Sequence, residues 1–370
     1  MKLTIERNVL IRALSHVQAV VERRNTIPIL SNILMQAADG RLRLTATDLD
    51  LEASDSAEAK VSRAGDITAQ AQVLFDVVRK LPDGSEILLE AKDNHLAISA
   101  GRSNYSLPTL PAADFQTMAR EDAAVTFDMP AAELRRLIDK TKFAISTEET
   151  RYYLNGIYLH HARGNEGPVL RAVATDGHRL ALAETKAPDG SSALEGVIVP
   201  RKTVMEVRKL LDDAPETVQV AATDAKIVFR IGDATLTSKL IDGSFPPYQR
   251  VIPKENPRRL VVDNKEFAAA VDRVATVSAE RSRSVKMSLS DSKLTLSVSH
   301  SDTGQGTEEV EAFYTFEPME IGFNAKYLLD VSSQIESSEV TFEFNDAASP
   351  ARVLDGKDAG AQYVLMPLRV

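Results

Sequence analysis

Three segments of the chain share a spacing of apolar residues that is typical of an amphipathic helix. They begin near residues 5, 128 and 263, each after a short extended run. Their apolar positions recur three to four residues apart, which predicts one buried face per helix. These positions are Val9, Leu10, Ala13, Leu14, Val17, Val20 and Val21; Leu134, Leu137 and Ile138; and Phe267, Val271 and Val274. Pro130 fits the first turn of the second helix, where its missing N–H costs nothing.

A second helical segment follows halfway through each unit, at 73–81, 203–211 and 327–335. Asp76, Glu206 and Asp330 occupy matching places in these three segments. Short alternating runs around polar turns come next, and they predict β-hairpins. The pattern therefore predicts an α+β fold of three repeated units, each with two helices and about six to eight strands, over residues 1–123, 124–256 and 257–370.

Composition narrows the class of protein. Apolar residues make up 44% and charged residues 26% of the 370 positions, as in globular proteins with real cores. No apolar run approaches the roughly 18 residues of a membrane span, and the first residues lack a signal-peptide pattern, so we expect a cytoplasmic protein. The chain has no cysteine, which excludes disulfides, thiolate catalysis and cysteine-ligated metals.

The stretch VATDGHRLALAE, residues 173–184, is the part of the chain that looks most like an active site. Ala-Thr-Asp also occurs at 46–48, one unit earlier, and LTLSVSHSDTG at 294–304 takes the corresponding place in the third unit. We interpret Asp48 and Asp176 as turn residues that bind nearby backbone N–H groups, because a catalytic aspartate would need no counterpart in the first unit. His178 remains as a candidate general base.

Other signs of an enzyme are missing from the sequence. There is no G-x-S-x-G motif, no phosphate-binding glycine loop and no histidine spacing that suits a metal. His160 and His161 are adjacent in an expected strand, so they point to opposite faces and cannot chelate one ion. We therefore expect no catalytic residue, no metal and no cofactor. A metal-free hydrolase that uses His178 stays as the alternative.

The charges are unevenly placed, although the net charge is −9. Lysines and arginines concentrate on the predicted helices, whereas acidic residues concentrate in strands and loops. One explanation is that both basic residues are good helix formers on solvated faces. The other is a basic helical layer that faces phosphates. Aromatic residues are only 5% of the chain, which favours contact with the duplex backbone over base stacking.

Several unlinked motifs resemble one protein family. RYYLNGIYL (151–159), ATDGHRLA (174–181), SKLIDGSFPPYQRVIP (238–253) and YVLMPLRV (363–370) are similar to the bacterial DNA polymerase III beta subunit, the replicative sliding clamp. MKLTIER at the start, IPILSNIL (27–34) and YSLPTLPAADF (105–115) agree with it, so the resemblance spans all three units. It implies clamp domains with two helices and two sheets each. It also implies a closed ring of two head-to-tail chains around duplex DNA, with helices inside and sheets outside.

The resemblance also implies three sets of site residues. A shared pocket for partner peptides is expected from Leu154, Thr175, Gly177, His178, Arg179, Leu180, Pro246, Arg250, Val251, Asn324, Tyr327, Val364, Met366, Pro367, Leu368 and Arg369. DNA contacts are expected from Arg24, Arg151, Tyr152, Tyr153, Arg201 and Lys202. The dimer interface is expected at Tyr105 and Leu107 on one chain and at Thr276 and Val277 on the other.

The implied partners are the polymerase III catalytic subunit, the clamp loader, and other polymerases and repair proteins that carry short Gln/Leu/Phe-type peptides. One feature departs from the family. The loop STEETRYY carries Glu148 and Glu149 where the family often has a neutral polar residue near DNA.

Overall fold

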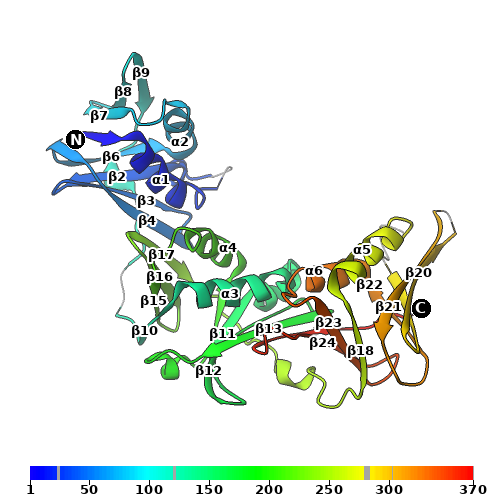
Figure 1. Ribbon diagram of the computed structural model, residues 1–370. Coiled ribbons are helices and arrows are strands. Elements are labelled where there is room, and N and C mark those ends of the chain that lie inside the picture. Colours follow the sequence, from blue (N-terminus) through cyan, green and yellow to red (C-terminus); the bar gives the residue numbers. More distant parts are fainter. Residues whose placement is uncertain (23–25, 120–121, 279–283, 302, 370) are drawn as a thin grey trace. The chain divides into compact units, whose positions relative to one another are not determined.

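The computed structural model describes residues 1–22, 26–119, 122–278, 284–301 and 303–369 (Figure 1). The chain forms two compact units. The first contains Met1–Leu134, Pro188–Leu194 and Lys202–Leu240, and the second contains Arg135–Ala187, Glu195–Arg201 and Ile241–Val370.

Six α-helices lie in the described part of the chain, two for each predicted repeat. They are α1 (Arg7–Gln18), α2 (Ala71–Lys80), α3 (Ala131–Thr141), α4 (Arg201–Leu210), α5 (Asn264–Ala275) and α6 (Ala325–Ser332). The helices α2, α4 and α6 begin two residues before the predicted starts, because a helix begins with its backbone and not with its first large apolar side chain. Pro130 ends a strand and immediately precedes α3, so it is not in the first helical turn.

The buried face of α1 follows the predicted spacing with one exception. Leu10, Ala13, Leu14 and Val17 are buried, and each large side chain contributes roughly 1.5–3 kcal/mol on burial. Val9 is 40% exposed, so its place on the apolar face was predicted wrongly. Glu6 caps the helix, with its carboxylate accepting from the N–H groups of Asn8 and Val9.

The matching acidic residues on α2, α4 and α6 share one role. Asp76, Glu206 and Asp330 are each the sixth residue of their helix. Each carboxylate pairs with a basic side chain on its own helix, three or four residues away, and the partners are Arg79, Lys209 and Lys326. Pairs at this spacing stabilise a helix by about 0.2–0.5 kcal/mol.

Two antiparallel sheets form the first unit. One runs in the order β5 (Lys60–Arg63), β1 (Lys2–Glu6), β7 (Glu86–Lys92), β8 (His95–Ala100) and β9 (Ser103–Pro108). The other runs β10 (Val125–Pro130), β15 (Thr217–Ala222), β16 (Lys226–Ile231), β17 (Ala234–Lys239), β4 (Leu51–Glu58), β3 (Arg41–Thr47), β2 (Asn32–Ala38) and β6 (Gly65–Gln70).

One antiparallel sheet of twelve strands runs through the second unit. Its order is β14 (Val197–Pro200), β11 (Gly156–Gly164), β12 (Gly167–Thr175), β13 (Arg179–Lys186), β25 (Ala361–Leu365), β24 (Ala351–Asp355), β23 (Glu339–Phe344), β18 (Arg258–Asp263), β21 (Gly304–Phe313), β20 (Lys293–His300), β19 (Ser284–Ser290) and β22 (Met319–Asn324).

The middle repeat is shared between the two units because its strands enter both larger sheets. β17 pairs with β4 of the first repeat, and β13 pairs with β25 of the third repeat. Figure 1 shows β13 beside strands that come from the C-terminal part of the chain. The second junction brings the VATDGHRLALAE stretch next to the last strand.

Candidate peptide-binding pocket

The turn between β12 and β13 is built by hydrogen bonds within the turn itself. Oδ1 of Asp176 accepts from the N–H groups of His178 (2.9 Å) and Arg179 (3.0 Å). Thr175 Oγ1 accepts from the Gly177 N–H and donates to the Arg179 carbonyl. Gly177 has φ +88°, a conformation that glycine adopts without strain. The aspartate is therefore a turn residue, as the sequence predicted.

The corresponding turn of the first repeat has the same construction. Asp48 Oδ1 accepts from the N–H groups of Asp50 and Leu51, and Thr47 Oγ1 bonds to the Leu49 N–H and the Leu51 carbonyl. Leu49 takes the place of Gly177 and has φ +78°. The repeat thus preserves the turn even where a side chain must accept a left-handed conformation.

Arg179 is held inside the protein by groups from several elements. Its side chain is 6% exposed, and its guanidinium donates to Asp176 (3.1 Å) and Asp330 (2.5 Å). A third hydrogen bond reaches the Phe143 carbonyl at 2.7 Å, and the guanidinium carbon lies 4.4 Å from the Tyr327 ring centroid. The family resemblance placed Arg179 in the pocket, and these contacts make it a buried cross-link as well.

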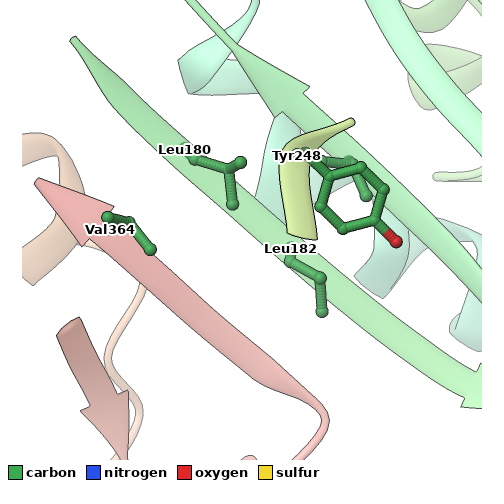
Figure 2. Packing of buried hydrophobic residues seen from close by; sticks show 5 residues of the cluster. Leu180, Leu182, Tyr248 and Val364 are labelled. Carbon is green, nitrogen blue, oxygen red and sulfur yellow. The ribbon is translucent and has the colours of Figure 1, made fainter. Parts of the chain in front are cut away.

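Strand register gathers apolar side chains on one face of the twelve-stranded sheet. Val173 pairs with Leu182 across β12 and β13, and Leu180 pairs with Val364 across β13 and β25. Directly paired residues share a face. Tyr248, from the short 3-10 helix η6 (Tyr248–Arg250), packs on these four residues to form one buried cluster (Figure 2).

A pocket of about 400 Å³ opens beside this cluster. Its lining is mostly apolar, with arginine and threonine groups among the aliphatic side chains. The lining residues are Arg151, Tyr153, Leu154, Thr175, Gly177, Arg179, Leu180, Pro246, Pro247, Tyr248, Arg250, Val251, Val364 and Met366. A concave apolar surface with a few polar groups is the usual form of a ligand site.

The C-terminal segment closes one side of the pocket. The Met366 N–H donates to the His178 carbonyl at 2.9 Å, and the Leu368 N–H donates to the Gly322 carbonyl at 2.8 Å. The side chain of Met366 is 39% exposed and that of Val251 is 48% exposed. These exposed apolar groups are available to a bound molecule.

Family models of the DNA polymerase III beta subunit match three consecutive stretches of the chain. The N-terminal domain model matches residues 1–119, the central domain model 128–247 and the C-terminal domain model 249–369. The chain belongs to the DNA polymerase III beta subunit family. It is accordingly a DNA sliding clamp with three domains of the clamp fold, a non-catalytic processivity factor of polymerase III.

Individual relatives agree over full length. The beta sliding clamp of Caulobacter vibrioides is 56% identical and that of Escherichia coli K12 is 38% identical, each over 100% of both chains. The crystal structure of the Caulobacter crescentus beta sliding clamp with bound PEG is similar to this chain, with a TM-score of 0.97 and 56% identity. The match covers 100% of this chain and 99% of the C. crescentus chain. A Bartonella birtlesii clamp bound to griselimycin has a TM-score of 0.97 at 47% identity, with 100% of both chains covered.

Membership of the sliding clamp family leaves the hydrolase hypothesis for His178 without support. His178 is exposed, and its ring stacks on Tyr327 with the centroids 6.4 Å apart. Within the described ranges, no group of three or more histidine, aspartate or glutamate side chains is arranged to hold a metal. No described helix is long and apolar enough to cross a membrane.

The residues expected in the clamp's peptide pocket divide into two groups. Those that line it are Leu154, Thr175, Gly177, Arg179, Leu180, Pro246, Arg250, Val251, Val364 and Met366. Those outside the lining are His178, Asn324, Tyr327, Pro367, Leu368 and Arg369. Asn324 caps α6 through its side-chain oxygen, which accepts from the Lys326 N–H.

Four lining residues were not expected there. Pro247 and Tyr248 lie inside the FPPYQRVIP motif, which was the available signal, but that motif did not say which side chains point inward. Arg151 and Tyr153, expected at DNA, also line the pocket. Glu148 pairs with Arg151 at 2.8 Å, and this hydrogen bond lowers the pKa of Glu148.

The residues expected to contact DNA differ in exposure and in ion pairing. Arg201 is exposed, and Tyr152 is 54% exposed. Lys202 instead pairs with Glu22 and, at 2.6 Å, with Asp48. Burial alone would lower the pKa of Lys202, but these hydrogen bonds outweigh it and raise the pKa. Arg24 lies outside the described residues.

The residues expected at the dimer interface lie at strand edges and a helix end. β9 is the outer strand of its sheet, and on it Tyr105 is 40% exposed whereas Leu107 is only 8% exposed. Thr276, after α5, is exposed, and Val277 lies beside Gly306 of β21.

Proposed function

We propose that this clamp is a head-to-tail dimeric ring that encircles duplex DNA in the cytoplasm, with helices facing the DNA and sheets outside. The proposed domains are 1–123, 124–256 and 257–370. Three repeats in each of two chains would close such a ring through unlike surfaces. The outer strand β9 supports this arrangement, because an unpaired edge is suited to pairing with another chain.

We further propose that the pocket binds short Gln/Leu/Phe-type peptides from the polymerase III catalytic subunit, the clamp loader, and other polymerases and repair proteins. The observation that carries this proposal is the apolar hollow of about 400 Å³ closed by Met366. PEG bound to a candidate beta-motif tethering region in the C. crescentus structure is consistent with a site of this kind in a relative.

The energetics suit partners that must exchange. Burying one leucine and one phenylalanine of a peptide contributes roughly 1.5–3 kcal/mol each, before ordering costs. We therefore expect a dissociation constant on the order of micromolar.

A truncation at the C-terminal segment tests the pocket. Deleting residues 366–370 removes Met366 and its hydrogen bond to the His178 carbonyl. A labelled hexapeptide Gln-Ala-Ala-Leu-Ala-Phe should bind the full chain and lose binding to the truncated chain, as measured by fluorescence polarisation.

Phe316→Ala is the matched control, because Phe316 is an exposed aromatic residue of the same unit outside the pocket lining. Its variant should bind the peptide like the full chain. Equal binding by the truncated chain, at unchanged oligomeric mass in light scattering, would refute the assignment.

A further inference from the structure

A polar cluster lies next to the apolar cluster on the same face of the sheet. His160 pairs with Arg171 across β11 and β12, and Arg171 pairs with Glu184 across β12 and β13. On the same strands, Tyr158 pairs with Val173, two positions from the first of these pairs. Because alternate residues of a strand share a face, the polar and apolar groups are neighbours.

Tyr248 spans the boundary between the two clusters. Its ring packs with Leu180, Leu182 and Val364, and it lines the pocket. Figure 2 shows its hydroxyl oxygen directed away from Val364. That oxygen lies 3.0 Å from His160 Nε2 and 3.1 Å from Arg171 Nη1.

The hydrogen-bond partners indicate which ring nitrogen of His160 carries a hydrogen and where the Tyr248 hydroxyl donates its own. His160 Nδ1 lies 2.9 Å from the His161 carbonyl, which can only accept, so Nδ1 carries a hydrogen. In a neutral imidazole Nε2 is then the acceptor, and the Tyr248 hydroxyl donates to it. Arg171 donates to the same hydroxyl and is itself fixed by Glu184 at 2.6 Å.

We propose that His160, Arg171 and Glu184 are positioning residues for the peptide pocket, which hold the Tyr248 ring in its wall by fixing the hydroxyl. Protonation of His160 loosens that hold and weakens peptide binding. This inference rests on the proposed function.

The reason is that a second proton on the His160 ring, at Nε2, changes the hydrogen bonds of the cluster. A protonated Nε2 must donate, so the Tyr248 hydroxyl would have to accept from both His160 and Arg171 while its own hydrogen loses its acceptor. A buried donor left without a partner is costly. The titratable and charged groups near His160 are Tyr158 and His161 on its own strand, Arg171 on β12 and Tyr248 on η6. None of them is an acid that would favour the cation.

Burial also lowers the pKa of His160, with Arg171 adding to the effect. The neutral form is therefore the one that the folded clamp maintains near neutral pH. Aromatic neighbours restrict movement of the His160 ring. The ring centroids of Tyr158 and His160 are 4.6 Å apart, and those of Tyr158 and Phe245 are 4.9 Å apart.

Tyr248→Phe and His160→Gln test the inference with the hexapeptide probe, between pH 5 and pH 8. Tyr248→Phe keeps the ring and removes the hydroxyl, so we expect peptide binding about tenfold weaker at pH 7.5. The unsubstituted clamp should bind more weakly as the pH falls. Both variants should show a flatter profile, because neither retains the pair that responds to the proton.

His161→Gln is the matched control, since His161 is the next residue of the strand and its side chain points to the other face. It should still bind the peptide more weakly as the pH falls, with the midpoint moved slightly to higher pH, because the charge of His161 helps to lower the pKa of His160. His178 at the exposed turn is present in the unsubstituted clamp and in all three variants, so any effect of His178 on the pH profile is common to them.

Thermal melting of each variant separates a loss of fold from a loss of positioning. Profiles of Tyr248→Phe and His160→Gln that coincide with the unsubstituted clamp would overturn the inference and leave the pocket assignment intact. Failure of the unsubstituted clamp to bind the peptide would instead count against the proposed function.

Discussion

The guanidinium of Arg179 stacks on the ring of Tyr327, with 4.4 Å between the guanidinium carbon and the ring centroid. Arg179 begins β13 of the middle repeat, and Tyr327 belongs to α6 of the third repeat. Arg179 also lines the pocket, and its planar cation pairs with Asp176 and Asp330 as well. This residue therefore connects two repeats at the place where partners are expected to bind.

Arg179→Ala should lower the free energy of unfolding by about 3 kcal/mol, because it removes a buried side chain that bonds Asp176, Asp330 and the Phe143 carbonyl. Asp330 keeps its pair with Lys326. Urea denaturation followed by circular dichroism measures the change. Arg250→Ala, at an exposed residue of the pocket, should change stability by less than about 0.5 kcal/mol. Equal effects of the two substitutions would contradict the cross-linking role.

Gly177→Ala should strain the turn backbone and crowd Arg151 in the pocket. Gly177 has φ +88°, and an added Cβ would lie 2.3 Å from Arg151 Nη1. We expect a cost of about 1–2 kcal/mol and weaker peptide binding. Gly84→Ala is the control, because Gly84 has φ +72° but open space around it. That variant should lose similar backbone stability and keep its peptide affinity in fluorescence polarisation.

Tyr105→Glu should produce monomers, as measured by light scattering. Tyr105 is exposed on the outer strand β9, so a carboxylate there would be buried at the proposed interface without a partner. Leu107 is a poorer site for the test, since it is buried within its own sheet and a charge would damage the fold. Tyr152→Glu, at another exposed tyrosine, should remain dimeric.

DNA binding should depend steeply on salt and not on base sequence, because the expected contacts are to phosphates. Arg201→Ala should lower the slope of log affinity against log salt by up to about one. Lys202→Ala should change the slope less, since Asp48 and Glu22 already neutralise that charge. A larger effect at Lys202 would show that its ion pairs open on DNA.

Acid should destabilise the fold through His160. Its pKa is lowered in the folded chain, whereas an unfolded histidine titrates at about 6.5. The unfolded chain therefore binds the proton first, and stability falls as the pH drops below about 6.5. Urea midpoints at pH 7.5 and pH 5.5 should differ more for the unsubstituted chain than for His160→Gln.

Local sequence predicted the features whose causes are local. The helix faces around Leu14 and Phe267 follow from spacing, and the turn at Asp176 follows from residue types that bond their own backbone. The family resemblance added Leu180 and Val364, which are far apart along the chain and adjacent in the sheet.

Features that depend on distant partners escaped prediction. The burial of Arg179 depends on Phe143 and Asp330, and the place of Tyr248 in the pocket wall depends on His160 and Arg171. Nothing in the neighbouring sequence of Arg179 or Tyr248 contains this information. The ion pairs of Lys202 were not predicted for the same reason, because its acidic partners come from the first repeat.

The pairing of β13 with β25 also bears on when the pocket can form during synthesis and folding of the chain. Leu180 and Val364 lie almost half the chain apart, and contacts of such long separation form late in folding because the intervening loop must close first. A chain still leaving the ribosome lacks the strand that completes the pocket. We therefore expect the proposed partner peptides to bind only a copy in which β25 has paired with β13.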